Sequence, residues 1–585
     1  MRRCSQSRLS RRERLAALVA YLVLAVVLFS ATWVSPQGRW IGDGGDPPLF
    51  MWFLRWVPYA LSHGVNPLVT SHLNLPDGVN LMWNTPVPLA GLLAAPLTVA
   101  MGPILAYNVL VTLAVAASAW FAYLMLRRYV ASPWAAGLGG LLYGFSPYVL
   151  AHARAHLNLT AALVPPLMLL LLDDVLVRQR RPPLVDGLLL GLLAAGQLLL
   201  SEELLASEML VALLGLAVLV ALNRRRSFEP ARVAHAFRAL AVALAVSLAI
   251  VAWPLYVQFF GPQRVRGGTL WRSGVFVSDL LAFVVPSGNQ ALSSAWTRSV
   301  TEQFSSACCV AEKNAYLGVP LLALLVAAVV WLRSRPLVRL AGILAGLLLL
   351  FSMGPQLQVG GRVTPVVLPF RLVSVLPVFG NLLAGRLMLY VFLFAAVIVA
   401  VLVEEVAKSR HWPSGLVALA LAAPLLPLVP TLPFPSKAAD VPAFFTSAAV
   451  ERIPQGAVVL VAPFPHDTNT AEPMLWQAVS GMRYRMLGGY ALGPDRSGRF
   501  DFLPLPTDLS ETMARLQGGE SPELTEDLRT RMWSVLDANR VDAVVVGPMP
   551  NRQGTVAFFG SLLGREGVGV GGVDLWTGLR AEGRR

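Results

Sequence analysis

The residues best suited to chemistry form a short acidic loop near the amino terminus, Gly42-Asp43-Gly44-Gly45-Asp46-Pro47-Pro48. Carboxylates such as Asp43 and Asp46 can act as a general base or hold a cation. Glycine tolerates backbone angles that other residues avoid, so the loop can bend closely around a ligand. The alternative is a solvated turn in which Asp46 caps a helix starting at Pro47. Four aromatic residues flank the loop: Trp40, Phe50, Trp52 and Trp56. We therefore interpret Asp46 and Asp43 as catalytic carboxylates.

A second acidic pair, Glu202-Glu203, lies between two leucine-rich stretches. Acidic side chains flanked so closely by leucine are costly in lipid and usually face a wet cavity. The alternative is a simple polar turn between two helices. We interpret Glu202 and Glu203 as site acids, and Glu208 as a weaker candidate.

A third polar group contains His152, Arg154, His156 and Asn158. Two histidines four residues apart share one helix face, but no third ligand is near in sequence, so a polar turn is favoured over a metal site. His156 is retained as a contact for acceptor or sugar. Trp83 and Asn84, in the same long loop as the acidic residues, are further candidates for that role.

Three arginines are candidates for binding a phosphate: Arg264, Arg371 and Arg386. Arg386 is the most informative, because it follows Phe379-Gly380-Asn381 at the mouth of an apolar stretch. A guanidinium there can hold a phosphate through two hydrogen bonds. The alternative is an arginine that reaches to the lipid headgroups.

The composition indicates a polytopic membrane protein. Of 585 residues, 56% are hydrophobic and 14% are charged, and the mean hydropathy is +0.61. The net charge of +14 does not indicate nucleic-acid binding, because the basic residues are almost all arginine and cluster between apolar stretches. The three cysteines form no disulfide framework and no metal-ligand spacing. We interpret the adjacent pair Cys308-Cys309 as incidental.

Apolar stretches of about 16–23 residues predict about eleven transmembrane helices, since roughly 20 helical residues cross a bilayer. The expected spans are 15–34, 104–126, 134–150, 159–176, 184–200, 204–222, 237–257, 316–332, 338–353, 387–403 and 415–429. With the basic residues 1–14 in the cytoplasm, every arginine cluster, including Arg224-Arg225-Arg226, falls on that side. The stretch 87–101 is then a re-entrant or interfacial helix.

This topology divides the chain into a cytoplasmic amino terminus (1–14), a transmembrane domain (15–430) and a carboxyl-terminal domain (436–585). The first extracytoplasmic loop, residues 35–103, carries interfacial helices. The carboxyl-terminal domain mixes β-like runs with helical patterns, which predicts a small extracytoplasmic α/β domain. It carries no recognisable catalytic motif.

The chain resembles the GT-C superfamily of integral-membrane glycosyltransferases, and in particular its uncharacterised actinobacterial-type members. The segments that carry the resemblance are Gly45-Asp46-Pro47, Asn66-Pro67, the run from Pro76-Asp77-Gly78 to Trp83-Asn84, Tyr143-Gly144-Phe145-Ser146-Pro147-Tyr148 and Glu202-Glu203. The resemblance implies a polyprenyl-phosphate-linked sugar donor, and a base that carries over onto Asp46 or Asp43. It also implies a cell-envelope acceptor, glycan or lipid, on the outer face of the bacterial cytoplasmic membrane.

Two departures from the superfamily matter. The spacing is Asp-x-x-Asp rather than the Asp-x-Asp tied to metal use, so a divalent cation, Mg or Mn, stays open. The Trp-Trp-Asp-Tyr-Gly signature of oligosaccharyltransferases is absent. Direct displacement by a deprotonated hydroxyl would invert the anomeric carbon. The competing functions are a lipid or polysaccharide transporter or flippase, and a non-catalytic scaffold for envelope assembly.

Overall fold

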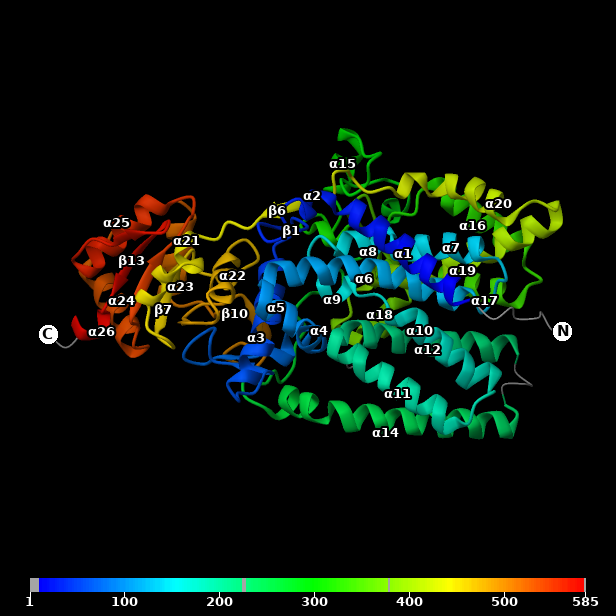
Figure 1. The fold of residues 1–585 in the computed structure, drawn as a ribbon, viewed down its shortest axis with the longest axis horizontal. Helices are drawn as coiled ribbons and strands as arrows, with labels where there is room; N and C mark the ends of the chain where they lie inside the picture. The colour runs from blue at the N-terminus through cyan, green and yellow to red at the C-terminus, as the bar shows by residue number, and fades with distance from the viewer. Residues whose placement is uncertain (1–9, 224–227, 377–378, 583–585) are drawn as a thin grey trace.

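The computed structural model describes residues 10–223, 228–376 and 379–582. The molecule is elongated, with a bundle of long helices at one end and a sheet-containing domain at the other (Figure 1). Residues 1–9 and Arg224-Arg225-Arg226, which the sequence assigns to the cytoplasm, lie outside the described residues.

Five helices of the described chain are long and apolar enough to cross a membrane. They are α6 (Pro103–Leu126), α11 (Pro183–Leu200), α12 (Glu202–Leu222), α14 (Pro230–Phe260) and the segment Ala384–Arg410, which contains α19 (Met388–Arg410). Shorter apolar helices are α16 (Val319–Trp331), α17 (Pro336–Ser352) and α20 (Ser414–Ala422), which continues to Leu428. Length and composition thus support a membrane protein with fewer full-length spans than expected.

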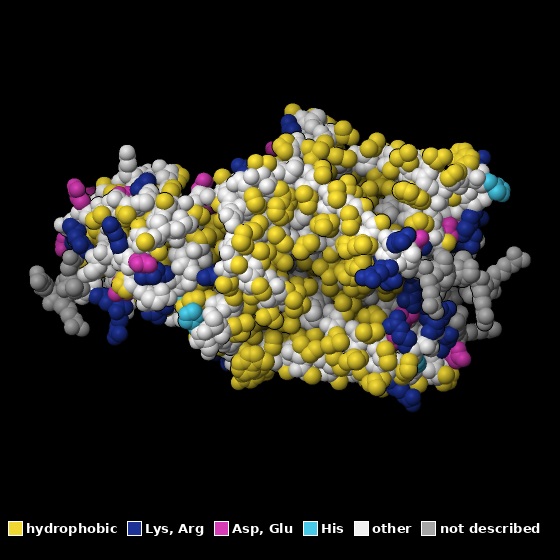
Figure 2. Space-filling view, viewed as in Figure 1, with side chains coloured by type: hydrophobic (Ala, Val, Ile, Leu, Met, Phe, Trp, Pro, Cys, Tyr) yellow, Lys and Arg dark blue, Asp and Glu magenta, His cyan; other side chains and the backbone are white. Residues whose placement is uncertain are grey.

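The helices differ in how much of their apolar surface the protein itself covers. In an apolar 18-residue window of each segment, 94% of the residues are buried for Ala384–Arg410, which contains α19, against 28% for α12 and 22% for α14. On the face drawn in Figure 2, apolar side chains cover the helical part, and charged side chains gather on the sheet-containing domain and at the opposite end of the molecule. Because exposed leucine faces of this extent need an apolar solvent, the outer helices are suited to contact lipid.

Two expected spans are broken into short helices. The stretch 134–150 is divided between α7 (Pro133–Gly144) and α8 (Pro147–His152). Ser146 caps α8 through the Val149 N–H, and Pro147 suits its first turn, so a new helix starts there. The stretch 159–176 is likewise divided between α9 (Leu157–Thr160) and α10 (Val164–Asp173). These breaks bring the polar residues from His152 to Asn158 inside the protein.

The remaining helices are short, lie in loops or, like the 18-residue α1, begin with several charged residues and fall outside the five. The stretch 87–101 forms α4 (Pro88–Leu93) and α5 (Ala95–Met101), both too short to span. The others are α1 (Arg11–Leu28), α2 (Ser30–Trp33), α3 (Pro47–Ser62), α15 (Ala295–Thr301), α18 (Phe370–Ser374), α21 (Ala443–Thr446) and α26 (Leu579–Glu582).

Residues beyond 436 build a five-stranded sheet in the order β12-β13-β11-β7-β8. Its strands are β7 (Val458–Ala462), β8 (Arg485–Met486), β11 (Ala543–Val546), β12 (Val568–Val570) and β13 (Val573–Thr577). Helices α22 (Glu472–Val479), α23 (Asp508–Gln517), α24 (Glu526–Ala538) and α25 (Arg552–Leu563) accompany it. The parallel strands β7 and β11 are buried throughout, which explains their continuous valine-rich sequences.

Four small antiparallel pairs complete the structure, and one of them joins the two parts of the chain. They are β2 (Val69–Thr70) with β3 (Val79–Asn80), β4 (Gln356–Val359) with β5 (Arg362–Val367), β9 (Ala491–Pro494) with β10 (Phe500–Leu503), and β1 (Arg39–Ile41) with β6 (Ser436–Ala438). The β1–β6 pair ends directly before the acidic loop and also begins the carboxyl-terminal domain.

Helix α3 packs on α22, and this contact buries the aromatic residues around the acidic loop. Trp40, Phe50, Trp52 and Trp56 are each at most 2% exposed. The Trp52 indole N–H donates to the Gln477 side-chain oxygen at 2.5 Å. These aromatic residues therefore fix the loop against the carboxyl-terminal domain and do not line an open site.

Candidate active site

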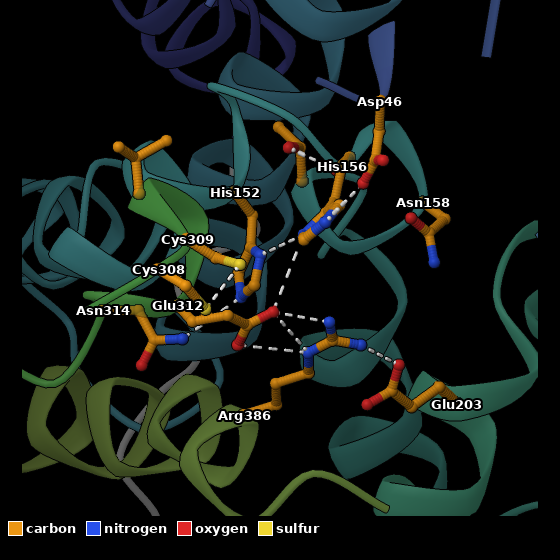
Figure 3. A network of polar contacts seen from close by, with 12 residues as sticks. Asp46, His152, His156, Asn158, Glu203, Cys308, Cys309, Glu312, Asn314 and Arg386 are labelled. Atoms are coloured by element: carbon orange, nitrogen blue, oxygen red, sulfur yellow. Dashed lines mark hydrogen bonds and ion pairs between the residues drawn. The ribbon is translucent and has the colours of Figure 1, made fainter. Parts of the chain in front are cut away.

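Asp46 begins helix α3, but its side chain makes no capping hydrogen bond to that helix. Its Oδ2 atom instead lies 2.8 Å from His156 Nε2 (Figure 3). Its Oδ1 atom is buried and has no hydrogen-bond partner within the described part of the chain. Capping, the alternative considered from the sequence, is therefore not what the carboxylate does.

The imidazoles of His156 and His152 form a line of contacts that begins at Asp46. His156 Nδ1 is 3.0 Å from His152 Nδ1, and His152 Nε2 is 3.3 Å from the Asn314 amide nitrogen. An amide nitrogen only donates, so His152 accepts at Nε2 and donates from Nδ1 to His156. His156 then donates from Nε2 to Asp46. Burial, and then His156 and Arg386, lower the pKa of His152, which keeps it neutral as this arrangement requires.

Arg386 and two acids lie beside this line. The Arg386 guanidinium binds Glu312 through Nη2 at 2.5 Å and Nε at 3.1 Å, and it also contacts Glu203. Arg386 is therefore held by two carboxylates and does not reach out to headgroups. Glu312 is the most buried of the three, with a side chain 3% exposed.

His152, His156 and Glu312 offer three ligand atoms that all lie within 4.8 Å of one another. The third ligand that is not near in sequence is thus supplied by Glu312, which comes from a distant loop. Two imidazoles and one carboxylate suit zinc or manganese better than magnesium, which prefers oxygen ligands. To bind a metal, His152 Nδ1 would first have to release the proton that it donates to His156.

Asp43 has a different partner. Its carboxylate accepts two hydrogen bonds from Arg154, at 2.7 and 2.6 Å. Arg154 also contacts the Asn289 side chain, whose amide donates to the carbonyls of Val310 and Lys313 at 2.8 and 3.1 Å. Asp43 therefore ties the acidic loop to the turn that carries Glu312.

Two glycines allow this loop to approach its neighbours. Gly42 has φ +94°, and a Cβ there would lie 2.2 Å from the Arg154 carbonyl oxygen. A Cβ on Gly45 would lie 2.6 Å from the Thr468 carbonyl oxygen, in the carboxyl-terminal domain. The backbone thus needs glycine at both positions to bring Asp43 and Asp46 between Arg154 and that domain.

The remaining candidates lie outside the line of imidazoles. The Glu202 carboxylate accepts from Gln258 at 2.8 Å, and the Asn84 side chain bonds both backbone groups of Leu492, at 3.0 and 2.8 Å. Trp83 packs on Phe259 and Phe500. Arg264 and Arg371 are exposed, and no ion pair joins them to these acids in the described residues. Asn84 thus also joins the first loop to the carboxyl-terminal domain, and its role as a sugar contact stays a prediction.

Three residues of the network around Asp46 were missed from the sequence, Glu312, Asn314 and Asn289, and Tyr490 was not linked to this network. Burial, and then the Asp46 carboxylate, raise the pKa of the Tyr490 phenol. The one signal that was available is the polar run Glu312-Lys313-Asn314 directly before an apolar helix. Tyr490 carries no such signal, because only the packing of the carboxyl-terminal domain brings it close.

The sequence matches the family described as Domain of unknown function (DUF6311) over residues 17–426, which is more than half of the chain. The chain belongs to the DUF6311 family. No curated protein matches its sequence.

Among solved structures, this DUF6311 chain is similar to the arabinofuranosyltransferase AftD from Mycobacteria. The TM-score is 0.54 at 16% identity, over 98% of this chain and 40% of AftD. It also matches the archaeal oligosaccharyltransferase AglB from Archaeoglobus fulgidus, with TM-score 0.45, 14% identity, and coverage of 91% and 69% of the two chains. The likeness to AftD confirms the GT-C-like fold. This chain spans less than half the length of AftD.

Proposed function

We propose that this DUF6311 protein is a membrane glycosyltransferase that moves a sugar from a polyprenyl-phosphate donor to a cell-envelope acceptor, glycan or lipid. The observation that carries the proposal is the setting of Asp46: His156 holds Oδ2, and Oδ1 is buried with no well-formed hydrogen bond among the described residues, although the Tyr490 phenol lies nearby. A carboxylate arranged in this way is suited to take a proton from a hydroxyl. The shared fold with AftD, named an arabinofuranosyltransferase, supports the same reaction class.

In the proposed reaction, Asp46 Oδ1 takes the proton of the acceptor hydroxyl as that oxygen attacks the anomeric carbon of the donor. The bond between this carbon and the phosphate oxygen breaks, and the phosphate leaves with the electron pair. Direct displacement inverts the anomeric carbon. The His156 N–H holds Oδ2 and so fixes the direction in which Oδ1 points.

Arg386 is the proposed partner of the donor phosphate. It is held by Glu312 and Glu203, so the phosphate must replace one of these acids. Glu203 is the better candidate to leave, because its side chain is 21% exposed and that of Glu312 only 3%. The guanidinium would then offset the charge that grows on the departing phosphate.

A divalent cation fits this site as a second source of positive charge. His152, His156 and Glu312 would hold it, and Asp46 would orient His156 from behind, as carboxylates do for metal-bound histidines. When bound, such an ion would stabilise negative charge on the phosphate. Elemental analysis of the purified protein, with His152→Gln as the matched variant, tests whether a cation is bound. Metal that is retained by the parent protein and lost in the variant would support the cation site. Absence of metal from both proteins would oppose it.

The proposed topology keeps the amino terminus in the cytoplasm and places Asp46 and the domain 436–585 on the outer side, with about eleven membrane crossings. The basic loops support this orientation. Single cysteines introduced at the exposed Ser497 and Ser521, in a protein whose Cys4, Cys308 and Cys309 are replaced by serine, test it. We expect an impermeant maleimide to label both in intact cells; labelling only after lysis would contradict the topology.

Asp46→Asn is the decisive experiment for the function. The amide keeps the size of the side chain but cannot accept the acceptor proton, so we expect transfer from lipid-linked sugar to fall by about 10²–10⁴. Thermal unfolding in detergent should show that the variant remains folded. Near-normal transfer by this variant would remove Asp46 from the proposed role.

One observation favours the competing transporter. Glu208 of α12 has no hydrogen-bond partner on either carboxylate oxygen in the described residues, and it lines a cavity between α10, α12, α17 and α19. Acids inside membrane helices often mark transport paths. Glu208→Gln should leave sugar transfer unchanged if the protein is a transferase. Loss of lipid export without any measurable transfer would favour the transporter.

A further inference from the structure

Two adjacent cysteines lie beside the Asp46 site. Cys308 and Cys309 are both free, and their sulfur atoms are 2.9 Å apart. Cys308 is exposed and Cys309 half-buried. Figure 3 shows both side chains between His152 and Glu312. The pair is therefore accessible from solvent on one side and faces the candidate active site on the other.

The backbone couples these cysteines to Glu312. Cys309 directly precedes the short 3₁₀ helix η4 (Val310–Glu312), and the Glu312 N–H donates to the Cys309 carbonyl at 3.0 Å. The Cys309 N–H in turn donates to the Ser306 carbonyl at 3.3 Å. A change in the Cys309 backbone therefore moves the residue that holds Arg386 and approaches His156.

The turn also has space beside it. A cavity of about 20 Å³ lies against Ser306, Glu312 and Asn314, with further lining from the loop around Thr301 and Phe304. Close-packed interiors resist displacement, whereas a cavity leaves room for a backbone to shift. Asn289 limits the shift, because it bonds the carbonyls of Val310 and Lys313.

We propose that Cys308 and Cys309 form an oxidation site that closes a disulfide between neighbouring residues and thereby lowers activity at the Asp46 site. The oxidant is a disulfide, of a protein or a small thiol. The Cys308 thiolate attacks one of its sulfur atoms and releases the first thiol; the Cys309 thiolate then attacks the Cys308 sulfur and releases the second. Two cysteine thiols become one disulfide, and their two protons end on the two released thiols.

This inference rests on the proposed function in one respect, the placement of the site on the outer face, where disulfides form and persist. The ring restricts the backbone between the two cysteines, so Glu312 shifts and its contact with Arg386 weakens. Because transfer depends on geometry at this contact, we expect oxidation to lower it by about tenfold or more. A reductant should restore it.

The covalent step is tested on the full-length protein carrying Cys4→Ser, with oxidised glutathione as the oxidant. After maleimide treatment, digestion and mass spectrometry, we expect the peptide with Cys308 and Cys309 to be unlabelled and lighter by two hydrogens than the reduced peptide. Dithiothreitol should restore labelling of both thiols. Two labelled thiols after oxidation would overturn the proposal.

The functional step is tested with the double variant Cys308→Ser/Cys309→Ser. Neither sulfur belongs to the proposed catalytic or binding groups, so the variant should keep the transfer rate of the reduced protein and be insensitive to oxidant. A variant inhibited as strongly as its parent would contradict the mechanism. Absence of transfer in every form would count against the glycosyltransferase, whereas the labelling result would still decide whether the disulfide forms.

Discussion

Asp43 and Asp46 are only three positions apart in the sequence, yet their side chains have different partners, which indicates different roles. Asp43 is held by two hydrogen bonds from the Arg154 guanidinium. Asp46 Oδ2 contacts the His156 imidazole, whereas Oδ1 makes no well-formed hydrogen bond within the described residues and has the Tyr490 phenol nearby. Both Asp43 oxygens are occupied by the guanidinium, so neither is free to accept a hydroxyl proton. The structure thus supports Asp46 as the base and Asp43 as the residue that positions the loop.

Asp43→Asn should therefore reduce the stability of the fold more than the rate of sugar transfer. It leaves Arg154 with a weaker partner; because the Asp43 side chain is 40% exposed, we expect a loss of only about 1–2 kcal/mol in the free energy of unfolding. Denaturant unfolding in detergent measures it, and a double-mutant cycle with Arg154→Gln isolates the pair. Abolished transfer with unchanged stability would mean that Asp43 is the base.

The acidic loop and the imidazoles were recognisable from residue types alone, but their partners were not. Asp46, His156 and Glu203 were each chosen from the sequence, and all three border the same group of contacts. Glu312 and Asn314 escaped notice because contacts between distant segments are fixed by tertiary packing, which local patterns do not encode. The same limit hid the contact of Asn84 with Leu492, far along the chain.

At the scale of elements, the positions of the site residues depend more on the breaks in the helical stretches than on the helices themselves. Hydropathy alone predicts one span over 134–150, because it averages over Ser146-Pro147, where α7 ends and α8 begins. The break directs His152, Arg154 and His156 towards the acidic loop. Helices without such interruptions lie closer to the predicted stretches: α6 covers Pro103–Leu126 where 104–126 was expected, and α14 ends at Phe260 where 257 was expected. The stretch 87–101 forms two helices that are each too short to cross a membrane.

Gly42→Ala tests how closely the loop must approach α8. Alanine at φ +94° is strained, and its Cβ would collide with the Arg154 carbonyl. Gly102→Ala is a matched control, because φ there is +90° and no atom lies within 4 Å of the new Cβ. We expect about 1–3 kcal/mol of backbone strain in both variants, with a further loss of stability and of transfer only in Gly42→Ala. Equal effects in thermal unfolding and transfer assays would show that the close approach is unimportant.

At the scale of the whole molecule, the first loop and the carboxyl-terminal domain are one packed unit. His72 lies in their interface: its ring contacts Trp56 and Tyr59, and its carbonyl accepts from Gln477 at 3.0 Å. Burial, and then Arg485 and His63, lower the pKa of His72 from 6.5 to about 4. Between about pH 4 and 6.5, the His72 imidazole therefore stays unprotonated in the folded protein but is protonated in the unfolded chain.

Stability should consequently fall as the pH drops below about 6.5 and continue to fall towards about 4, with no contribution from His72 above that window. His72→Phe keeps an aromatic ring between Trp56 and Tyr59 and should make the melting temperature less dependent on pH. It will not remove the dependence, because the pKa of His152 is lowered as well. His411→Phe, at an exposed position, controls for the loss of an imidazole. Identical pH profiles for parent and His72→Phe would refute the assignment.

The pairing of β1 with β6 has a consequence for how the protein is made. Arg39 bonds Ser436, 397 positions later in the chain, and Gly42 donates to the Pro435 carbonyl at 2.8 Å. At about 5–20 residues per second, a ribosome needs roughly 20–80 s to synthesise the intervening segment. During that time the acidic loop has already emerged but lacks the strand that fixes it. A nascent or truncated chain that ends before Ser436 therefore lacks the strand that holds this loop in place.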